Sequence, residues 1–203
     1  MSAVFADEKS LFATSEEWLQ AAVDTSLRSV VQTITGMVIP DVRIGVGFPS
    51  TGKSGSTLAE TWPRKAANDN VNEITVRVTM SDPVEVLGVL LHELIHVGFD
   101  GKYGHGKRFQ KEFARLGFMG DPKGHMMSPE LRNNLKTLAD SLGVYPRKEG
   151  LQEFIAKHKQ TTRLHKVICQ TCGLNFRLTQ KWIDKAVQLD CPDRACVGGI
   201  MVD

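Results

Sequence analysis

The chain has 203 residues, of which 41% are hydrophobic and 24% are charged, and its formal net charge is +2. This composition argues against a disordered chain, and the length is enough for one full core with a small additional module. No apolar run approaches the length of a membrane span and no secretory signal precedes the first helix, so we expect a soluble intracellular protein.

The first expected element is an amphipathic helix that begins after Thr14. Thr14 and Glu17 form the pattern of a capping box, and Gly36 followed by Pro40 predicts where the helix ends. Apolar residues at helical spacing form one broad face that should pack on a core: Trp18, Leu19, Ala22, Val23, Leu27, Val30, Val31 and Ile34.

Three segments with the composition of β-strands follow the helix. Residues 42–48, 58–62 and 73–79 favour strands, and the polar segments between them favour loops. The pattern predicts a small antiparallel meander.

The loop after the first strand contains GFPSTGKS, residues 47–54, which matches the phosphate-binding pattern GxxxxGK[ST]. In a nucleotide site of that kind a helix begins at the lysine, so that Lys53 reaches the phosphates and Ser54 holds magnesium. The residues after Lys53 instead include a glycine, several serines and threonines, and Pro63, a composition that does not favour a long helix. We therefore expect no nucleotide-binding residues and interpret the segment as the mobile tip of a hairpin.

The next helix should begin at Pro83 and be buried. Asp82 as N-cap and Glu85 three residues later again form the pattern of a capping box, and proline suits the first helical position. The residues that follow, VEVLGVLLHELIHVGF, are apolar on nearly every side. Such a helix belongs in the middle of a domain.

Near its end this helix carries the motif HExxH, written here as HELIH. His92 and His96 lie one turn apart, so both imidazoles can bind one zinc ion. Glu93 can then reach a zinc-bound water and act as the general base. A hydrolytic zinc needs a third protein ligand, for which the residues alone leave three candidates: His105, Asp100 and, more remotely, His125.

Two more helices are expected after the motif. One is amphipathic and begins just after His105, and the other lies between Pro129 and Gly143. Tyr103 and His125 are nearby polar groups that could stabilise an oxyanion. We expect each to be a loop or core residue instead and leave both out of the predicted site.

The C-terminal part is basic and carries all four cysteines. From Val144 onward ten Lys and Arg residues outnumber six Asp and Glu, which favours a polyanionic partner. A basic linker with a possible short helix at 151–159 leads to the cysteines. Paired cysteines in an intracellular chain favour a structural zinc site, on whose metal a small ribbon would depend for folding: Cys169, Cys172, Cys191 and Cys196.

HELIH, a short glycine-bearing connection and then HGKRF resemble the HExxH…HGxxF/W arrangement of the SprT/Spartan-like zinc metalloproteases. The cysteine segment resembles the C-terminal zinc ribbon of that family, so the resemblance spans roughly residues 15–203. It implies His105 as the third ligand of a catalytic zinc, with Glu93 as the catalytic residue. It also implies an α+β fold: a zincin-like domain with an N-terminal helix, a small antiparallel sheet, a buried HExxH helix and further helices, followed by a zinc ribbon.

The expected organisation is a protease domain over 1–145, a basic linker over 146–166 and a zinc ribbon with four cysteine ligands over 167–203. We expect a zinc-dependent endopeptidase with one catalytic and one structural zinc ion and a protein substrate. Some members of the family it resembles cleave proteins attached to DNA. We therefore expect DNA, single-stranded or at exposed ends, to bind the basic C-terminal region. We also expect the protein to be cytoplasmic and of bacterial or phage origin.

A different class of function is also compatible with the sequence. The chain could be a nucleic-acid-binding regulatory protein, related to transcription, that uses the ribbon while its other metal site is hydrolytically idle. Glu93 argues against this alternative, because an idle site needs no carboxylate beside the metal.

Overall fold

A computed structural model describes residues 10–147, 164–185, 190–197 and 200–202 of the chain. The chain divides into two compact units, residues 1–155 and 156–203, and each is described by itself. Most of the expected basic linker, including the possible helix at 151–159, lies outside the described residues.

The expected N-terminal helix forms as three consecutive helical segments: α1 (Ser15–Ala22), the π-helical turn η1 (Val23–Leu27) and α2 (Arg28–Thr35). The capping box is confirmed, because the Thr14 hydroxyl accepts from the N–H of Glu17 and the Glu17 carboxylate accepts from the N–H of Thr14. Gly36 ends the helix at a φ of 76°, which glycine adopts without steric cost.

The three expected strands form, but their arrangement differs from the antiparallel meander. They are β1 (Val42–Gly47), β2 (Ala59–Trp62) and β3 (Asn72–Arg77), and their spatial order is β1-β3-β2. β1 pairs with β3 in parallel, and β2 pairs with β3 antiparallel. The expectation of an antiparallel sheet is therefore wrong: the sheet is mixed.

The side chains of the strands explain this order. Ile74 and Val76 of β3 are fully buried, whereas β2 carries Glu60 and the 45% exposed Trp62. A central strand must bury its side chains, while a strand with charged and exposed residues is suited to an edge. β2 therefore forms one edge of the sheet.

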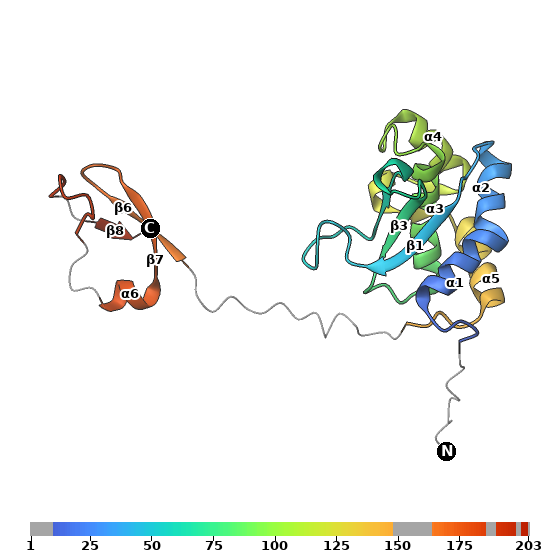
Figure 1. Ribbon diagram of the computed structural model, residues 1–203, viewed down its shortest axis with the longest axis horizontal. Helices are drawn as coiled ribbons and strands as arrows, with labels where there is room; N and C mark the ends of the chain where they lie inside the picture. Colours follow the sequence, from blue (N-terminus) through green and yellow to red (C-terminus); the bar gives the residue numbers. More distant parts are fainter. Residues whose placement is uncertain (1–9, 148–163, 186–189, 198–199, 203) are drawn as a thin grey trace, which may run out of the picture. The chain divides into compact units, whose positions relative to one another are not determined.

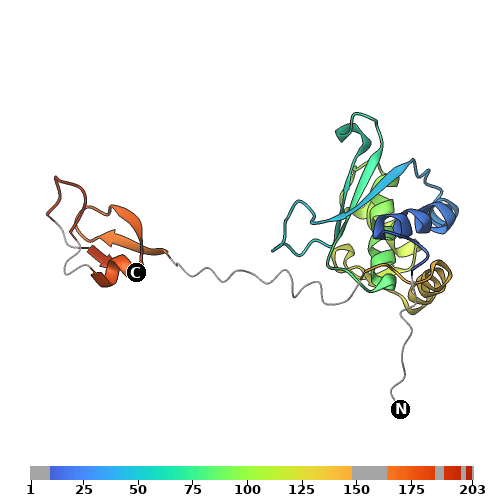
Figure 2. The same cartoon turned by 60° about the horizontal axis from the view of Figure 1, so that its bottom comes forward.

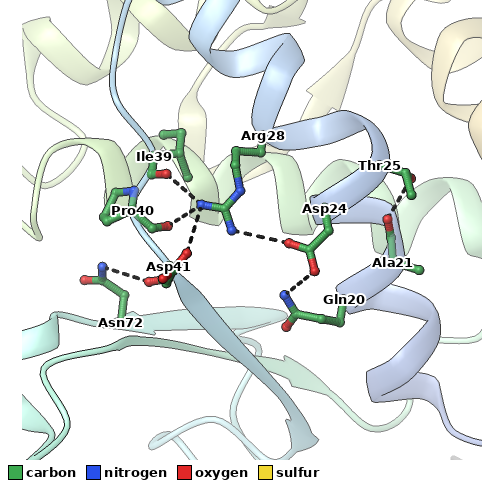
Figure 3. Close-up of polar contacts among 9 residues, drawn as sticks. All are labelled: Gln20, Ala21, Asp24, Thr25, Arg28, Ile39, Pro40, Asp41 and Asn72. Carbon is green, nitrogen blue, oxygen red and sulfur yellow. Dashed lines mark hydrogen bonds and ion pairs between the residues drawn. The ribbon is translucent and has the colours of Figure 1, made fainter.

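Arg28 fixes the chain where it passes from α2 to β1 (Figure 3). Its guanidinium donates to the carbonyl oxygens of Ile39 and Pro40, both at 2.7 Å, and pairs with the Asp24 carboxylate at 3.3 Å. Because Pro40 lies just before β1, these bonds hold the start of the strand close to the helix.

All of the segment GFPSTGKS except Gly47, the last residue of β1, lies in the connection between β1 and β2, residues 48–58, which projects from the end of the sheet (Figures 1 and 2). β1 and β2 are not neighbours, so the segment is not a hairpin tip, and no helix begins at Lys53. The Arg77 guanidinium donates to the carbonyl oxygens of Gly52, Lys53 and Thr57. A phosphate loop presents N–H groups to an anion, whereas here carbonyl oxygens converge on a cation. This polarity is the reverse of a phosphate site.

Helix α3 (Pro83–Gly98) lies in the middle of the first unit, between the sheet and the other helices (Figures 1 and 2). Every residue from Val86 to Ile95 is buried, as expected. Asp82 is confirmed as the N-cap, since its carboxylate accepts from the N–H groups of the second and third helical residues. The Glu85 carboxylate pairs with Arg132 rather than completing a capping box.

The remaining elements of this unit are short except for two helices: η2 (Arg64–Ala66), α4 (Lys107–Arg115), β4 (Phe118–Met119), η3 (Pro122–Gly124), β5 (Met126–Met127) and α5 (Pro129–Leu142). Ser128 caps α5 and Gly143 ends it, as expected. No helix among the described residues is both long and apolar enough to cross a membrane.

The second unit is a small sheet with one short helix: β6 (Leu164–Cys169), β7 (Asn175–Thr179), α6 (Gln180–Lys185) and β8 (Ile200–Val202). Its strand order is β7-β6-β8, and both pairings are antiparallel. β6 begins at Leu164, inside the range expected for the linker. In 164–185 and 190–197 only Val167 and Cys169 are buried, so the described side chains form almost no apolar core.

Candidate functional site

The histidines of the motif lie on α3, which is buried at every residue from Val86 to Ile95. His92 is 1% exposed and Glu93 is 4% exposed. His92 and His96 are four residues apart on α3, so their imidazoles lie on the same face. The surrounding apolar residues of the helix leave few other polar groups to satisfy these side chains.

The chain after α3 turns back through left-handed backbone conformations. Asp100, Gly101, Tyr103 and Gly104 have φ values of 54°, 70°, 73° and 44°. Glycine tolerates such values, and aspartate does so better than most other residues. The turn returns the chain to α3, so that His105 lies beside the motif just before α4 begins.

The structure brings three histidines together. The Nε2 atom of His105 lies 3.0 Å from Nε2 of His92 and 3.2 Å from Nε2 of His96. The three ligand nitrogens all lie within 4.8 Å of one another. His105 is therefore the third-ligand candidate that the fold places at the pair.

Hydrogen bonding alone does not account for this convergence. A neutral imidazole has a single N–H, so Nε2 of His105 cannot donate to both of its neighbours. Tetrahedral zinc with Zn–N bonds of about 2.0–2.1 Å holds its nitrogens about 3.3 Å apart. The two measured separations are close to this value, and the three histidines therefore form a candidate metal site.

Phe109 holds the three imidazoles in place from α4. Its ring stacks on His96 with centroids 4.4 Å apart and contacts His92 and His105, each at 4.9 Å. Phe109 is the last residue of HGKRF, one helical turn after His105. The spacing of that segment thus brings a ligand and its packing partner to the same place.

The rival candidate Asp100 has another partner. Its carboxylate lies 3.5 Å from the guanidinium of Arg64, and it is absent from the histidine cluster. Tyr103 is 49% exposed, and its hydroxyl accepts from Arg108 at 2.6 Å. Neither side chain lines the cleft described below.

Burial sets the protonation of the motif histidines. Burial, together with a smaller effect of the neighbouring imidazoles, lowers the pKa of His92 to about 2 and that of His96 to about 4. Both rings are therefore neutral near pH 7, which is the form that binds metal. Nδ1 of His92 has no hydrogen-bond partner among the described residues.

Glu93 points toward β2. Its Oε2 accepts a hydrogen bond of 2.7 Å from the Thr61 hydroxyl. The pKa of Glu93 is raised to about 7, because the effect of burial outweighs the opposing hydrogen bond from Thr61 and is assisted by the nearby Glu60. A carboxyl group with a pKa near neutral is suited to exchange protons as an acid or a base.

A cleft of about 530 Å³ opens over these residues. It is lined on one side by β2 and the residues before it, Ser56–Thr61, and on the other by Gly101, Gly104, Lys123 and His125, with the three histidines and Glu93 among its lining residues.

Two residues that line the cleft lie outside the site predicted from the sequence. Thr61 is one, and no local pattern links a threonine in β2 to a glutamate on α3. His125 is the other: the sequence offers it only as a remote third-ligand candidate outside the predicted site, and ligand atoms of His92, Glu93 and His125 lie within 4.8 Å of one another. His125 reaches the cleft from a turn in which its φ is 51°.

The four cysteines of the second unit form another candidate metal site. Their sulfur atoms all lie within 4.8 Å of one another, with 3.6 Å between Cys169 and Cys196 and 3.5 Å between Cys172 and Cys191. Tetrahedral zinc with Zn–S bonds of about 2.3 Å holds its sulfurs about 3.8 Å apart. Cys191 and Cys196 are separated by four residues whereas Cys169 and Cys172 are separated by two, and the longer spacing does not prevent a four-sulfur site.

The first cysteine pair sits on a tight turn. Gly173 has a φ of 75° and its N–H donates to the carbonyl of Cys169 at 3.0 Å, while the N–H of Thr171 donates to the Cys169 sulfur at 3.4 Å. Bonds from the N–H groups of Cys172 and Thr171 lower the pKa of Cys169 to about 6. This turn therefore favours the thiolate, which is the metal-binding form.

Comparisons of the chain with models of known protein families, with curated proteins and with solved structures found no match. The fold and the two residue clusters therefore define a general class of protein. The chain is an α+β protein with a candidate metal site of three histidines beside a glutamate, and a second candidate site of four cysteines.

Proposed function

We propose that the chain is a zinc-dependent endopeptidase of the SprT/Spartan type. The observation that carries this proposal is the convergence of three imidazole nitrogens with a buried glutamate one residue from the first of them, in a cleft. Three protein ligands leave one position of a tetrahedral metal open, as hydrolysis requires and a structural site does not. The resemblance of HELIH and HGKRF to that family supports the same assignment.

In this proposal His92, His96 and His105 hold zinc. A zinc ion held there would act as a Lewis acid, which would polarise a substrate carbonyl and lower the pKa of a bound water. Glu93 takes a proton from the attacking water and delivers it to the leaving amine. His125, in the cleft wall, supplies an imidazole that can stabilise negative charge on the carbonyl oxygen.

The edge strand β2 suits an extended substrate. Within the described sheet it pairs only with β3, so its other side is free to bond with a peptide backbone. The residues of the cleft wall on this side are small or of medium size, which leaves room for varied side chains. The test of the proposed activity is cleavage of an unfolded polypeptide by the wild type and by the Glu93→Gln variant.

We also propose that the second unit binds single-stranded nucleic acid. Lys166 of β6 and Arg177 of β7 are exposed and stand directly opposite each other in the register. Like charges in that position destabilise a sheet, which an anionic partner would relieve. Trp182 is 58% exposed, with the Lys185 ammonium 5.6 Å from its ring centre, so its ring is available for stacking on a base.

Arg177→Glu should weaken the binding of a fluorescent single-stranded oligonucleotide several-fold in about 0.15 M salt. The salt dependence of log K should also become less steep by about 0.7, the contribution of one phosphate contact on a single strand. Lys136→Glu, which changes an exposed lysine of α5, is the matched control and should change neither quantity. Equal losses in the two variants, or no binding by the wild type, would contradict the proposal.

A further inference from the structure

The contact between Thr61 and Glu93 joins the edge strand to the helix of the motif. Thr61 lies in β2, where it pairs with Ile74 of β3. Its hydroxyl is 2.7 Å from Oε2 of Glu93 and 3.3 Å from the backbone oxygen of the same residue. A hydroxyl has one hydrogen to donate, and the shorter contact to the charged acceptor is the stronger bond.

This bond divides the roles of the two carboxylate oxygens. Oε2 is occupied by Thr61, and among the described residues Oε1 has no hydrogen-bond partner. The Glu93 carboxyl group also contributes a ligand-type oxygen to the cluster with His92 and His125. Oε2 is thereby anchored to the sheet, and Oε1 can still accept a hydrogen bond.

The anchor is rigid because both of its ends are held. Thr61 belongs to a hydrogen-bonded strand and is β-branched, so its χ1 is restricted. Glu93 is 4% exposed on a fully buried helix. Glu93 also lines the cleft, so without the hydroxyl its carboxylate would lose its one hydrogen bond to a described side chain and could turn about its χ angles.

We propose that Thr61 is a positioning residue that holds the carboxylate of Glu93 in the orientation needed to accept a proton from water. The proposal rests on the proposed peptidase function for its kinetic consequence, and on the contact itself for its structural one. A general base must lie within hydrogen-bond reach of the proton that it removes, so a rotated carboxylate lowers the rate of the chemical step without changing how substrate binds.

The test compares Thr61→Val with Thr61→Ser in the full chain. Valine keeps the shape and removes the donor, so kcat should fall by about tenfold or more, as expected for one lost bond to a charged group, while KM and zinc content stay unchanged. Serine keeps the hydroxyl and should retain kcat within about threefold of the wild type. Thr75→Val makes the same change in β3, at a residue outside the cleft lining, and should leave kcat unchanged.

A crystal structure of Thr61→Val gives a readout that needs no activity. We expect the Glu93 carboxylate to leave its wild-type position or to occupy two rotamers. An unmoved carboxylate, a kcat within about twofold of the wild type, or an equal loss in Thr61→Ser would overturn the positioning role. Absence of hydrolysis by the wild type would instead contradict the proposed function, and the crystallographic comparison would still decide the role of Thr61.

Discussion

Replacing Glu93 by Gln is expected to reduce kcat for the cleavage of an unfolded polypeptide by about 10²- to 10⁴-fold, the usual contribution of a general base. Glutamine has nearly the same shape, and its amide oxygen can still accept from the Thr61 hydroxyl, so the side chain should stay in place. An amide cannot take up a proton at neutral pH. The loss should therefore appear in kcat, with the zinc content and KM close to the wild-type values.

The matched control for this variant is Glu112→Gln. Glu112 is also a buried glutamate, 9% exposed, but it lies on α4 and pairs with Arg115 at 2.6 Å. Its replacement should leave kcat within about twofold of the wild type, because a charge paired away from the cleft contributes little to the chemical step. Cleavage by Glu93→Gln at more than about a tenth of the wild-type rate would show that the residue is not the general base.

Replacing Cys169 by Ser is expected to unfold the second unit while the first stays folded. Among its described side chains only Val167 and Cys169 are buried, so the described residues supply little apolar burial to hold this sheet together. A structural zinc supplies about 10–16 kcal/mol in small domains of this kind. In ¹H–¹⁵N correlation spectra of the full chain, the signals of β6 and β7 should collapse to unfolded positions, and those of α3 should not move.

Thr171→Ala provides the control for this second effect. Thr171 lies in the same turn, but its contact to Cys169 is made by its backbone N–H, which alanine retains. The variant should keep the dispersed signals and the wild-type zinc content. Dispersed signals of β6 and β7 in the Cys169→Ser variant would mean that the unit folds without its four-sulfur site.

Features encoded locally could be predicted from the sequence. The caps at Thr14 and Asp82 form within a few residues, and helical periodicity places His92 and His96 on one face whatever surrounds them. The four cysteines cluster as expected, and the turn that brings Cys169 and Cys172 together is built by neighbouring residues. The residues alone left three candidates for the third metal ligand, and His105 was chosen because of the resemblance to the SprT/Spartan-like family.

Features that depend on long-range packing could not be predicted. All three strand segments of the sheet were recognised, but local propensity does not say which pair lies side by side. The order follows from the burial of Ile74 and Val76, which requires β3 to be central. The prediction that Lys53 lies in a hairpin tip was wrong because β1 and β2, which flank its loop, are not adjacent in the sheet.

The cleft residues Thr61 and His125 illustrate the same limit. Thr61 meets Glu93 only because β2 lies at the edge of the sheet beside α3. His125 reaches the site only because its backbone adopts a left-handed conformation in the turn before β5. No sequence spacing links Thr61 to Glu93, and the residues alone named His125 only as a remote candidate for the third ligand.

The proposed zinc site consists of His92, His96 and His105 beside Glu93. Its most direct test is an anomalous difference map at the zinc absorption edge, from crystals of the full chain grown with zinc. We expect one peak about 2.0–2.1 Å from Nε2 of His92, His96 and His105, and a second among the four cysteine sulfurs. The His105→Ala variant should lose only the first peak. A wild-type map without zinc among the three histidines, or with zinc bound by His92, Glu93 and His125 instead, would contradict this proposal.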